Sequence, residues 1–169
     1  MHKTRTCALT GLDGIVVETE VDIAPGLPAF HIVGLPDTAL HESRERVRAA
    51  IRNSGVEFPV RRIAVSLAPA DIRKSGPAYV LSIAIGILTS TGQVPELDDS
   101  SLLLGELALD GSLRPTMGML PMVAVGKRQG FKRAFVPAAN AEEAALVDGI
   151  DVFPVKNLAE MIAFLRSEK

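Results

Sequence analysis

The sequence predicts a mixed α/β fold of the α+β kind, with strands first and then alternating helices and strands. Two stretches near the amino terminus alternate with period two, as strands do, and the chain beyond residue 60 changes repeatedly between strand-like and helix-like patterns. Hydrophobic residues make up 47% of the chain and aromatic residues only 4%, so we expect an aliphatic core. A chain of 169 residues without a linker or repeat suits a single domain over 1–169.

The first half of the chain is expected to hold a hairpin, a strand, a helix and a further strand. In order, these are a β-hairpin over 4–23 that turns at GLDG (11–14), the strand FHIVG (30–34), a helix over 35–55 and the strand VRRIAVSLAP (60–69). Asp37 or Thr38 can cap the helix, and Gly55 can end it in a left-handed conformation.

The second half continues with helices and strands in turn. We expect a helix over 78–91, a strand pair over 102–115 that reverses at Asp110-Gly111, a helix over 118–129, the strand KRAFVP (132–137), a helix over 141–149, the strand DVFPV (151–155) and a helix over 158–169. Asn140 and Asn157 are the expected caps of the last two helices, and Gly130 ends the helix before them.

Charge, cysteine content and hydropathy narrow the class of protein. The net charge of −2 argues against a surface that binds nucleic acid all over, although a local basic patch is compatible with it. Cys7 is the single cysteine, which excludes an internal disulfide and fits a reducing cytoplasm. The longest apolar stretch, 78–88, is too short to span a membrane, and the amino terminus lacks a secretion signal. We therefore expect a soluble, cytoplasmic protein.

Nucleotide and metal sites are not expected in this chain. The pair Gly126-Lys127 lacks the glycine five residues earlier and the hydroxyl residue that a phosphate-binding P-loop requires, because Pro121 and Arg128 stand there. The histidines at 2, 31 and 41 are scattered and form no metal-ligand spacing. The sequence therefore predicts no bound cofactor and no metal.

The Ser75-Gly76-Pro77 turn, which leads into the helix over 78–91, is a candidate catalytic site. Charged residues precede it at Asp71, Arg73 and Lys74, and a helix amino terminus can bind anions. Ser75, Ser82 and Cys7 are the candidate nucleophiles, but none has a base at a suitable spacing. The interpretation that the turn is scaffold is favoured, and a serine hydrolase that uses Ser75 or Ser82 stays as an alternative.

A row of arginines is the strongest candidate for a contact surface. Arg44, Arg48 and Arg52 are spaced four residues apart, so they lie along one face of the expected helix. Four further cations can lie nearby, namely Arg61, Arg62, Arg73 and Lys74. The row can contact phosphates of DNA or an acidic partner, or it can be an ordinary solvated face with Glu42 and Glu45. No aromatic residue interleaves the row in sequence, so stacking on unpaired bases is not expected.

Three longer stretches resemble one known family. They are GLPAFHIVGLPDTALHESRERVRAAIRNSG (26–55), FPVRRIAVSLAPADIRKSGPAYVLSIAIGIL (58–88) and LLLGELALDGSLRPTMGMLP (102–121). Together they closely resemble the amino-terminal domain of the ComM/YifB proteins, which are magnesium-chelatase-like AAA+ ATPases. The resemblance runs from about residue 5 to the end of the chain. It implies a fold like that of the Lon proteolytic domain, of the ribosomal protein S5 domain 2 type.

The resemblance to Lon also bears on catalysis. In Lon-type proteases a nucleophilic serine follows the turn that corresponds to Ser75-Gly76-Pro77, and here that position is Ala78. The partner lysine falls, by residue count, at Met122. The resemblance therefore implies a degenerate Ser-Lys dyad and no protease activity. The chain departs from its own family at Val80-Leu81-Ser82, where members usually have Asp-Leu-Pro and hence a charge near the helix start.

The resemblance implies a role within a larger machine. Family members carry an AAA+ motor domain after this one, bind ATP and Mg²⁺ there, assemble into hexameric rings and act on branched DNA, with branch migration in recombination and transformation as the activity. This chain is then expected to be a non-catalytic accessory domain that docks on its own motor domain and neighbouring subunits and contacts branched DNA. A pure protein-interaction module without DNA contact is the other alternative.

Overall fold

The computed structural model describes residues 2–10, 13–34, 37–69 and 79–167 and has a mixed α/β fold, as expected. The strands are β1 (His2–Thr10), β2 (Asp13–Ala24), β3 (Ala29–Val33), β4 (Arg62–Ala68), β5 (Ser101–Leu103), β6 (Glu106–Leu107), β7 (Leu113–Arg114), β8 (Arg133–Pro137) and β9 (Asp151–Val155). The helices are α1 (Thr38–Glu42), α2 (Arg44–Asn53), α3 (Val80–Ser90), α4 (Met119–Arg128), α5 (Ala141–Ala144) and α6 (Leu158–Ser167), with the 3-10 helix η2 (Ala138–Asn140) before α5.

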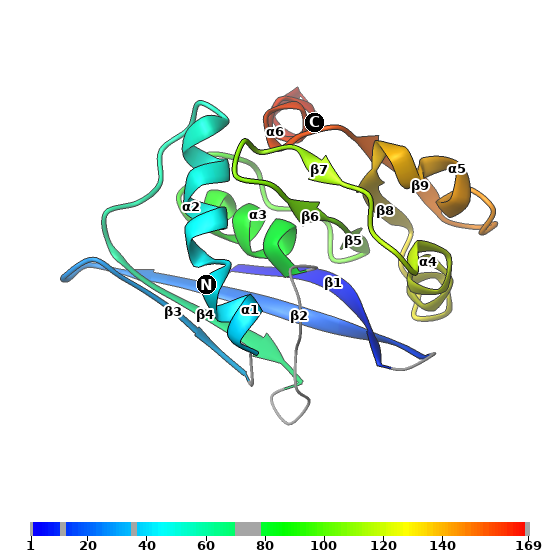
Figure 1. Ribbon diagram of the computed structural model, residues 1–169, viewed down its shortest axis with the longest axis horizontal. Coiled ribbons are helices and arrows are strands. Elements are labelled where there is room, and N and C mark those ends of the chain that lie inside the picture. Colours follow the sequence, from blue (N-terminus) through cyan, green and yellow to red (C-terminus); the bar gives the residue numbers. More distant parts are fainter. Residues whose placement is uncertain (1, 11–12, 35–36, 70–78, 168–169) are drawn as a thin grey trace.

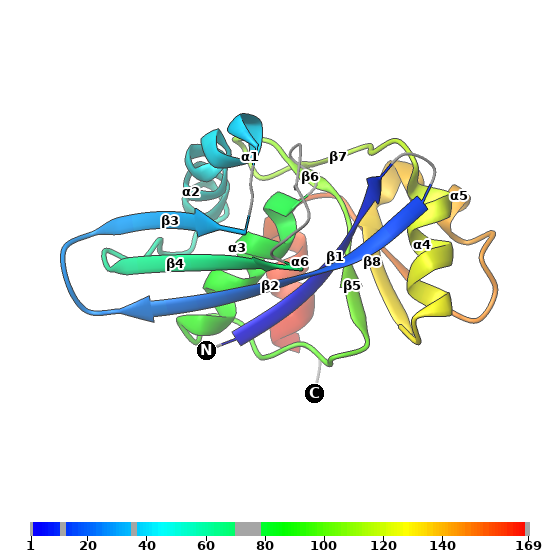
Figure 2. The same cartoon turned by 90° about the horizontal axis from the view of Figure 1, so that it is seen from below.

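A four-stranded sheet in the order β1-β2-β4-β3 forms one side of the molecule (Figure 1). β1, β2 and β4 run antiparallel, whereas β3 is parallel to β4 and lies at the edge. The hairpin expected from the period-two pattern is therefore confirmed in β1 and β2, with Cys7 opposite Val16. Seen from below, no described helix lies over β3 and β4, so this face of the sheet is uncovered there (Figure 2).

The β1–β2 hairpin is shared by two hydrophobic cores, because alternate side chains of a strand point to opposite faces. Val17 and Val21 pack with the buried helix α3 in one core, and Cys7 packs with α4 in the other. Almost every residue of α3 is buried. Gly86 is required there by close approach, since a Cβ at this position would lie 2.6 Å from a methyl group of Val21.

A second, three-stranded sheet has the order β5-β8-β9, and its strands are all parallel. This differs from the expected strand pair over 102–115. Leu102 and Leu103 belong to β5 and pair with β8, and only β6 and β7 form a hairpin that reverses at Asp110-Gly111. The chain leaves β5 at Gly105, whose φ of 139° is open to glycine but strained for other residues, so the expected strand is interrupted there.

The expected helix over 35–55 is two helices, α1 and α2, that meet at Ser43. Asp37 caps α1, because its side chain accepts a hydrogen bond of 2.7 Å from the Leu40 backbone N–H. The Ser43 hydroxyl donates to the Leu40 carbonyl, a back-bond of the kind that bends helices. Gly55 has a φ of 81° just after α2, so the expected left-handed stop is confirmed.

The expected caps of the last two helices fared differently. Asn157 caps α6, since its side-chain oxygen accepts a 2.7 Å hydrogen bond from the Glu160 N–H. Asn140 precedes α5 but does not cap it. Its side chain instead accepts from the Thr116 N–H and donates to the Thr116 carbonyl, which ties α5 to the segment before α4. Asn140 therefore makes its side-chain hydrogen bonds with Thr116, which is distant in sequence, and not with the first amides of α5.

Candidate functional site: an arginine face

Ser82 lies in the core and not in a site. Its side chain is buried, its hydroxyl donates to Thr19 Oγ1 at 2.9 Å, and it lies 2.8 Å from Thr4 Oγ1. Thr4 also donates to the Ser82 carbonyl at 2.8 Å. These contacts join α3 to β1 and β2, and they leave no room for a substrate at the hydroxyl.

Cys7, the other described candidate nucleophile, is buried in the core between the hairpin and α4. Burial raises the pKa of its thiol to about 11, so little thiolate exists near neutral pH. Ser75 lies outside the described residues. The described part of the chain therefore offers no activated nucleophile at either of these two positions.

The structure describes only one of the two positions that the sequence resemblance assigns to a Lon-type dyad. Met122 lies on α4, is buried and packs in the same core as Cys7. Ala78 lies outside the described residues, as does the turn at 75–77. Val80, Leu81 and Ser82, where the resemblance led us to expect Asp-Leu-Pro, are all buried at the start of α3. An aspartate at position 80 would lie in an apolar core here, so the valine suits its surroundings.

The described residues contain no cluster of three or more His, Cys, Asp or Glu side chains that could hold a metal ion. His31 is exposed on the edge strand β3, and His41 is exposed on α1. His2 Nδ1 lies 3.7 Å from a carboxylate oxygen of Glu96. Among the described helices, none combines the length and the apolar character that crossing a membrane demands.

Arg44 differs from the other arginines of α2 because its guanidinium is used within the fold. Its Nη1 donates to the Phe30 carbonyl at 2.8 Å, and its Nε donates to the His41 carbonyl at 2.9 Å. These bonds hold the start of α2 against α1 and β3. Arg44 is thus half-buried, and its donors are partly committed to backbone oxygens.

Arg48 and Phe58 bring a cation and an aromatic ring together. The Arg48 guanidinium lies 5.1 Å from the centre of the Phe58 ring and also pairs with Glu45. Phe58 packs against Phe30 at 5.8 Å between ring centres. The sequence places no aromatic residue within the row of arginines, but the structure brings Phe58 beside it, because the loop between α2 and β4 returns beside the helix. The expectation that unpaired bases do not stack on this surface stays a prediction.

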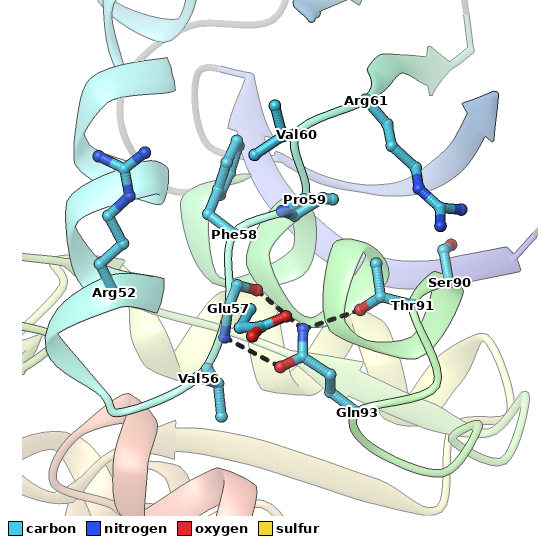
Figure 3. Close-up of a pocket in the computed structure, with 10 residues that line it drawn as sticks. All are labelled: Arg52, Val56, Glu57, Phe58, Pro59, Val60, Arg61, Ser90, Thr91 and Gln93. Carbon is cyan, nitrogen blue, oxygen red and sulfur yellow. Dashed lines mark hydrogen bonds between the residues drawn. The ribbon is translucent and has the colours of Figure 1, made fainter. Parts of the chain in front are cut away.

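Arg52 and Arg61 line a hollow of about 810 Å³ between the end of α2, the 56–61 segment and the end of α3 (Figure 3). In Figure 3 the Arg61 guanidinium points toward Ser90, and Arg52 extends from α2 on the other side of Phe58. The Ser90 hydroxyl oxygen is buried and has no hydrogen-bond partner among the described residues. A neighbouring hollow of about 340 Å³ is lined by Arg48, Arg52 and Arg61 as well.

Gln93 fixes the segment that carries Phe58 and Arg61. Its side-chain oxygen accepts from the Glu57 N–H at 3.0 Å, and its side-chain nitrogen donates to the Glu57 carbonyl at 2.8 Å and to Thr91 Oγ1 at 2.9 Å (Figure 3). The Gln93 side-chain amide thus forms two hydrogen bonds with the backbone of Glu57, one as acceptor and one as donor, as a neighbouring β-strand would. Sequence reasoning missed Gln93, because nothing in its local pattern shows a partner 36 residues away.

Apolar side chains are exposed among the arginines. Val60 is 76% exposed beside Arg61, and Leu27 is 86% exposed next to Pro28, which lines the smaller hollow. We call this surface the arginine face, and define it by Leu27, Arg48, Arg52, Phe58, Val60 and Arg61.

The remaining candidate cations do not share this surface or are not described. Arg62 is exposed and alternates with buried Ile63, so it lies on the uncovered side of the four-stranded sheet. Arg73 and Lys74 lie outside the described residues. The structure thus brings together Arg48, Arg52 and Arg61.

The arginine face is suited to binding acidic groups, because guanidinium groups donate hydrogen bonds in a fixed fork and stay charged. Among the residues that line its hollows, no histidine or cysteine is present, and the one lining carboxylate that pairs with a cation is that of Glu45. The geometry therefore favours recognition over covalent chemistry.

Comparison with known proteins agrees with this fold. Residues 19–140 match the family model described as subunit ChlI of Mg-chelatase, which covers most of the chain. The chain belongs to the ChlI family. Within it, the chain is 49% identical over 160 residues to an uncharacterized protein of Mycobacterium tuberculosis, with 94% of this chain and 32% of that protein covered.

Two named relatives are more distant. This ChlI-family chain is 38% identical over 165 residues to the uncharacterized protein YifB of Escherichia coli and 37% identical over 167 residues to the competence protein ComM of Haemophilus influenzae. Each match covers 96% of this chain and 32% of the relative. The chain thus spans about a third of the length of the curated relatives it matches. The ComM/YifB resemblance seen in the sequence is confirmed.

A weaker similarity links the chain to Lon. It is 29% identical over 122 residues to Lon protease 2 of Bacillus subtilis, covering 71% of this chain and 22% of that protein. The mixed α/β fold with open sheets is consistent with a ChlI- and Lon-like fold.

Proposed function

We propose that this chain is a non-catalytic accessory domain of a ComM-like AAA+ ATPase. The observation that carries the proposal is the burial of Ser82, whose hydroxyl is bonded to threonines of two strands and is closed off from substrate. Buried Met122 and the high pKa of buried Cys7 support it. Ala78 completes the argument as a proposal from the sequence, because a methyl group cannot serve as a nucleophile.

The parent protein would supply the chemistry. Relatives three times as long as this chain, among them ComM, support a parent with a motor domain that binds ATP and Mg²⁺. In this proposal the parent forms a hexameric ring in the cytoplasm and drives branch migration of branched DNA in recombination and transformation. The present chain would act by position, docking on the ring with its arginine face as the contact surface.

A fluorophosphonate probe tests the non-catalytic role. Such probes react with activated serines, and we expect no labelling of the native chain above that of urea-unfolded chain. Mass spectrometry of the digested protein would locate any adduct. A stoichiometric adduct on Ser75 or Ser82 would sink the proposal and favour the serine-hydrolase alternative.

Contact with DNA is a second candidate function, favoured by the exposed guanidinium groups of Arg52, Arg61 and Arg62. Fluorescence anisotropy of a labelled four-way junction, titrated with the chain at several salt concentrations, measures it. If these arginines contact phosphates, changing all three to alanine should lower the slope of log affinity against log salt by about three, roughly one for each contact. Changing Arg114, Arg128 and Lys156 to alanine removes the same charge elsewhere and is the matched control. Equal losses in the two variants would mean that only net charge matters.

A further inference from the structure

We propose that the arginine face of one copy of this chain binds an acidic face around α5 on a second copy, so that copies associate head to tail. The proposal rests on the docking role proposed above and names the partner of that surface. It depends on three observations, which are the unpaired charges at one end of the molecule, the complementary charges at the other end, and the placement of both.

The arginine face combines free charge with exposed apolar surface. Within the described part of the chain, the side chains of Arg52 and Arg61 make no hydrogen bond or ion pair. Val60 and Leu27 beside them are largely exposed. Arginine and aromatic residues around apolar side chains are typical of protein interfaces, whereas a DNA backbone offers phosphates and sugars but few apolar groups. The face therefore fits a partner that presents carboxylates together with an apolar side chain.

The α5 face has that chemistry. We define it by Glu142, Glu143, Leu146 and Asp148, which are all exposed. Leu146 is 72% exposed, and the three carboxylates form no ion pair with any described residue. The bonds between Asn140 and Thr116 bring Met117, which is 93% exposed, close to the start of α5.

Several carboxylates elsewhere on the chain are already engaged within the fold. Glu18 and Glu20 lie 3.2 and 3.7 Å from the Lys3 ammonium, and Asp99 lies 3.2 Å from Arg5. Asp98 and Asp110 each accept hydrogen bonds from a serine two residues later. On the α5 face itself, Lys127 is the nearby cation, because its side chain lies against Gly149. It reduces the negative charge of the face without pairing with the carboxylates.

The two faces lie at opposite ends of the molecule. In Figure 1 the longest axis is horizontal, with α2 toward the left and α5 at the right, and the turned view in Figure 2 agrees. One chain cannot bring these faces together, so they can meet only between copies. Such a contact uses a different surface on each partner and leaves one free face at either end, so it repeats and forms a ring or a chain.

Charge-reversal variants in analytical ultracentrifugation test the contact. One variant carries Arg52→Glu and Arg61→Glu, and the other carries Glu142→Lys and Glu143→Lys. We expect the wild type to self-associate at low salt, with affinity that falls as salt rises, and each variant to associate about a hundredfold more weakly. An equimolar mixture of the two variants should associate again. The reversed arginine face of the first variant is acidic and can bind the reversed, basic α5 face of the second, and the two unchanged faces can bind each other as in the wild type. Circular dichroism shows whether each variant is folded, and Arg114→Glu with Arg128→Glu is the matched control.

Three results would overturn the contact. The first is a wild type that stays monomeric at low salt up to about 0.3 mM, where even an affinity near 1 mM is detected. The second is association that neither reversal weakens or that the mixture does not restore. The third is loss of junction binding in the arginine variant with unchanged self-association, which would make the face a nucleic-acid site. Fluorophosphonate labelling would instead defeat the non-catalytic role and leave the contact standing.

Discussion

Ser82 shows at the scale of one residue how a candidate nucleophile becomes part of the fold. Its hydroxyl joins α3 to two strands through Thr4 and Thr19, in a region otherwise made of aliphatic side chains. Buried hydroxyl groups that lack partners cost about 1–3 kcal/mol, so this set of bonds is an element of stability.

Changing Ser82 to alanine should therefore lower the free energy of unfolding by about 1–3 kcal/mol, because Thr19 and Thr4 lose a hydrogen-bond partner without regaining water. Urea unfolding followed by circular dichroism measures this. Ser90→Ala is the matched control, since the Ser90 hydroxyl has no partner among the described residues and its loss should cost little. Equal effects of the two substitutions would show that the Ser82 bonds contribute nothing.

Cys7 and Tyr79 should make the stability of the fold decrease as the pH rises into the alkaline range. Burial raises the pKa of Cys7 from 9.0 to about 11 and that of Tyr79 from 10.0 to about 12. Both groups hold their proton more tightly in the folded chain, so their contribution is complete below pH 9 and is lost as the pH rises toward these values. We expect the free energy of unfolding, measured with urea, to fall between about pH 8 and pH 10.5 by up to about 2 kcal/mol more in the wild type than in Cys7→Ala. Parallel losses in both proteins would contradict the role of Cys7.

At the scale of elements, local capping residues fix the ends of some helices but not of others. Asp37, Gly55 and Asn157 end or begin helices as their types predict, because caps act on amides within three or four residues. Asn140 has the same side chain as Asn157 at the same kind of position, yet it bonds to Thr116.

The two asparagines give a direct comparison. Asn157→Ala should destabilise the chain by about 1 kcal/mol and reduce the protection of the first α6 amides from hydrogen exchange, because the Glu160 N–H loses its acceptor. Asn140→Ala should leave the α5 amides unchanged and expose the Thr116 amide instead. Exchange measured by NMR separates the two, and faster exchange at α5 in Asn140→Ala would show that Asn140 caps after all.

At the scale of the whole molecule, two cores share the β1–β2 hairpin and should unfold together. Tyr79, the single tyrosine, lies in the core with α3, whereas Met122 lies in the core with α4. Met122→Ala should cost about 2–5 kcal/mol, and tyrosine fluorescence should report the full loss although the tyrosine is in the other core. Met117→Ala, at an exposed position, is the control. A tyrosine transition that does not move while circular dichroism does would show that the cores unfold separately.

The sequence by itself determined the class of fold and most of the elements, because period-two and helical patterns, caps and glycine stops are local features. It did not show that the helix over 35–55 divides at Ser43 or that the strand pair over 102–115 is interrupted at Gly105. It also determined the family, since the resemblance lies in long stretches of residues. Only the tertiary structure decided that Phe58 joins Arg48, that Arg44 is tied to backbone carbonyls, and that Ser82 is bonded within the core. These facts depend on contacts between residues far apart in the chain, and such contacts are fixed by packing and by buried hydrogen bonds that no local pattern encodes.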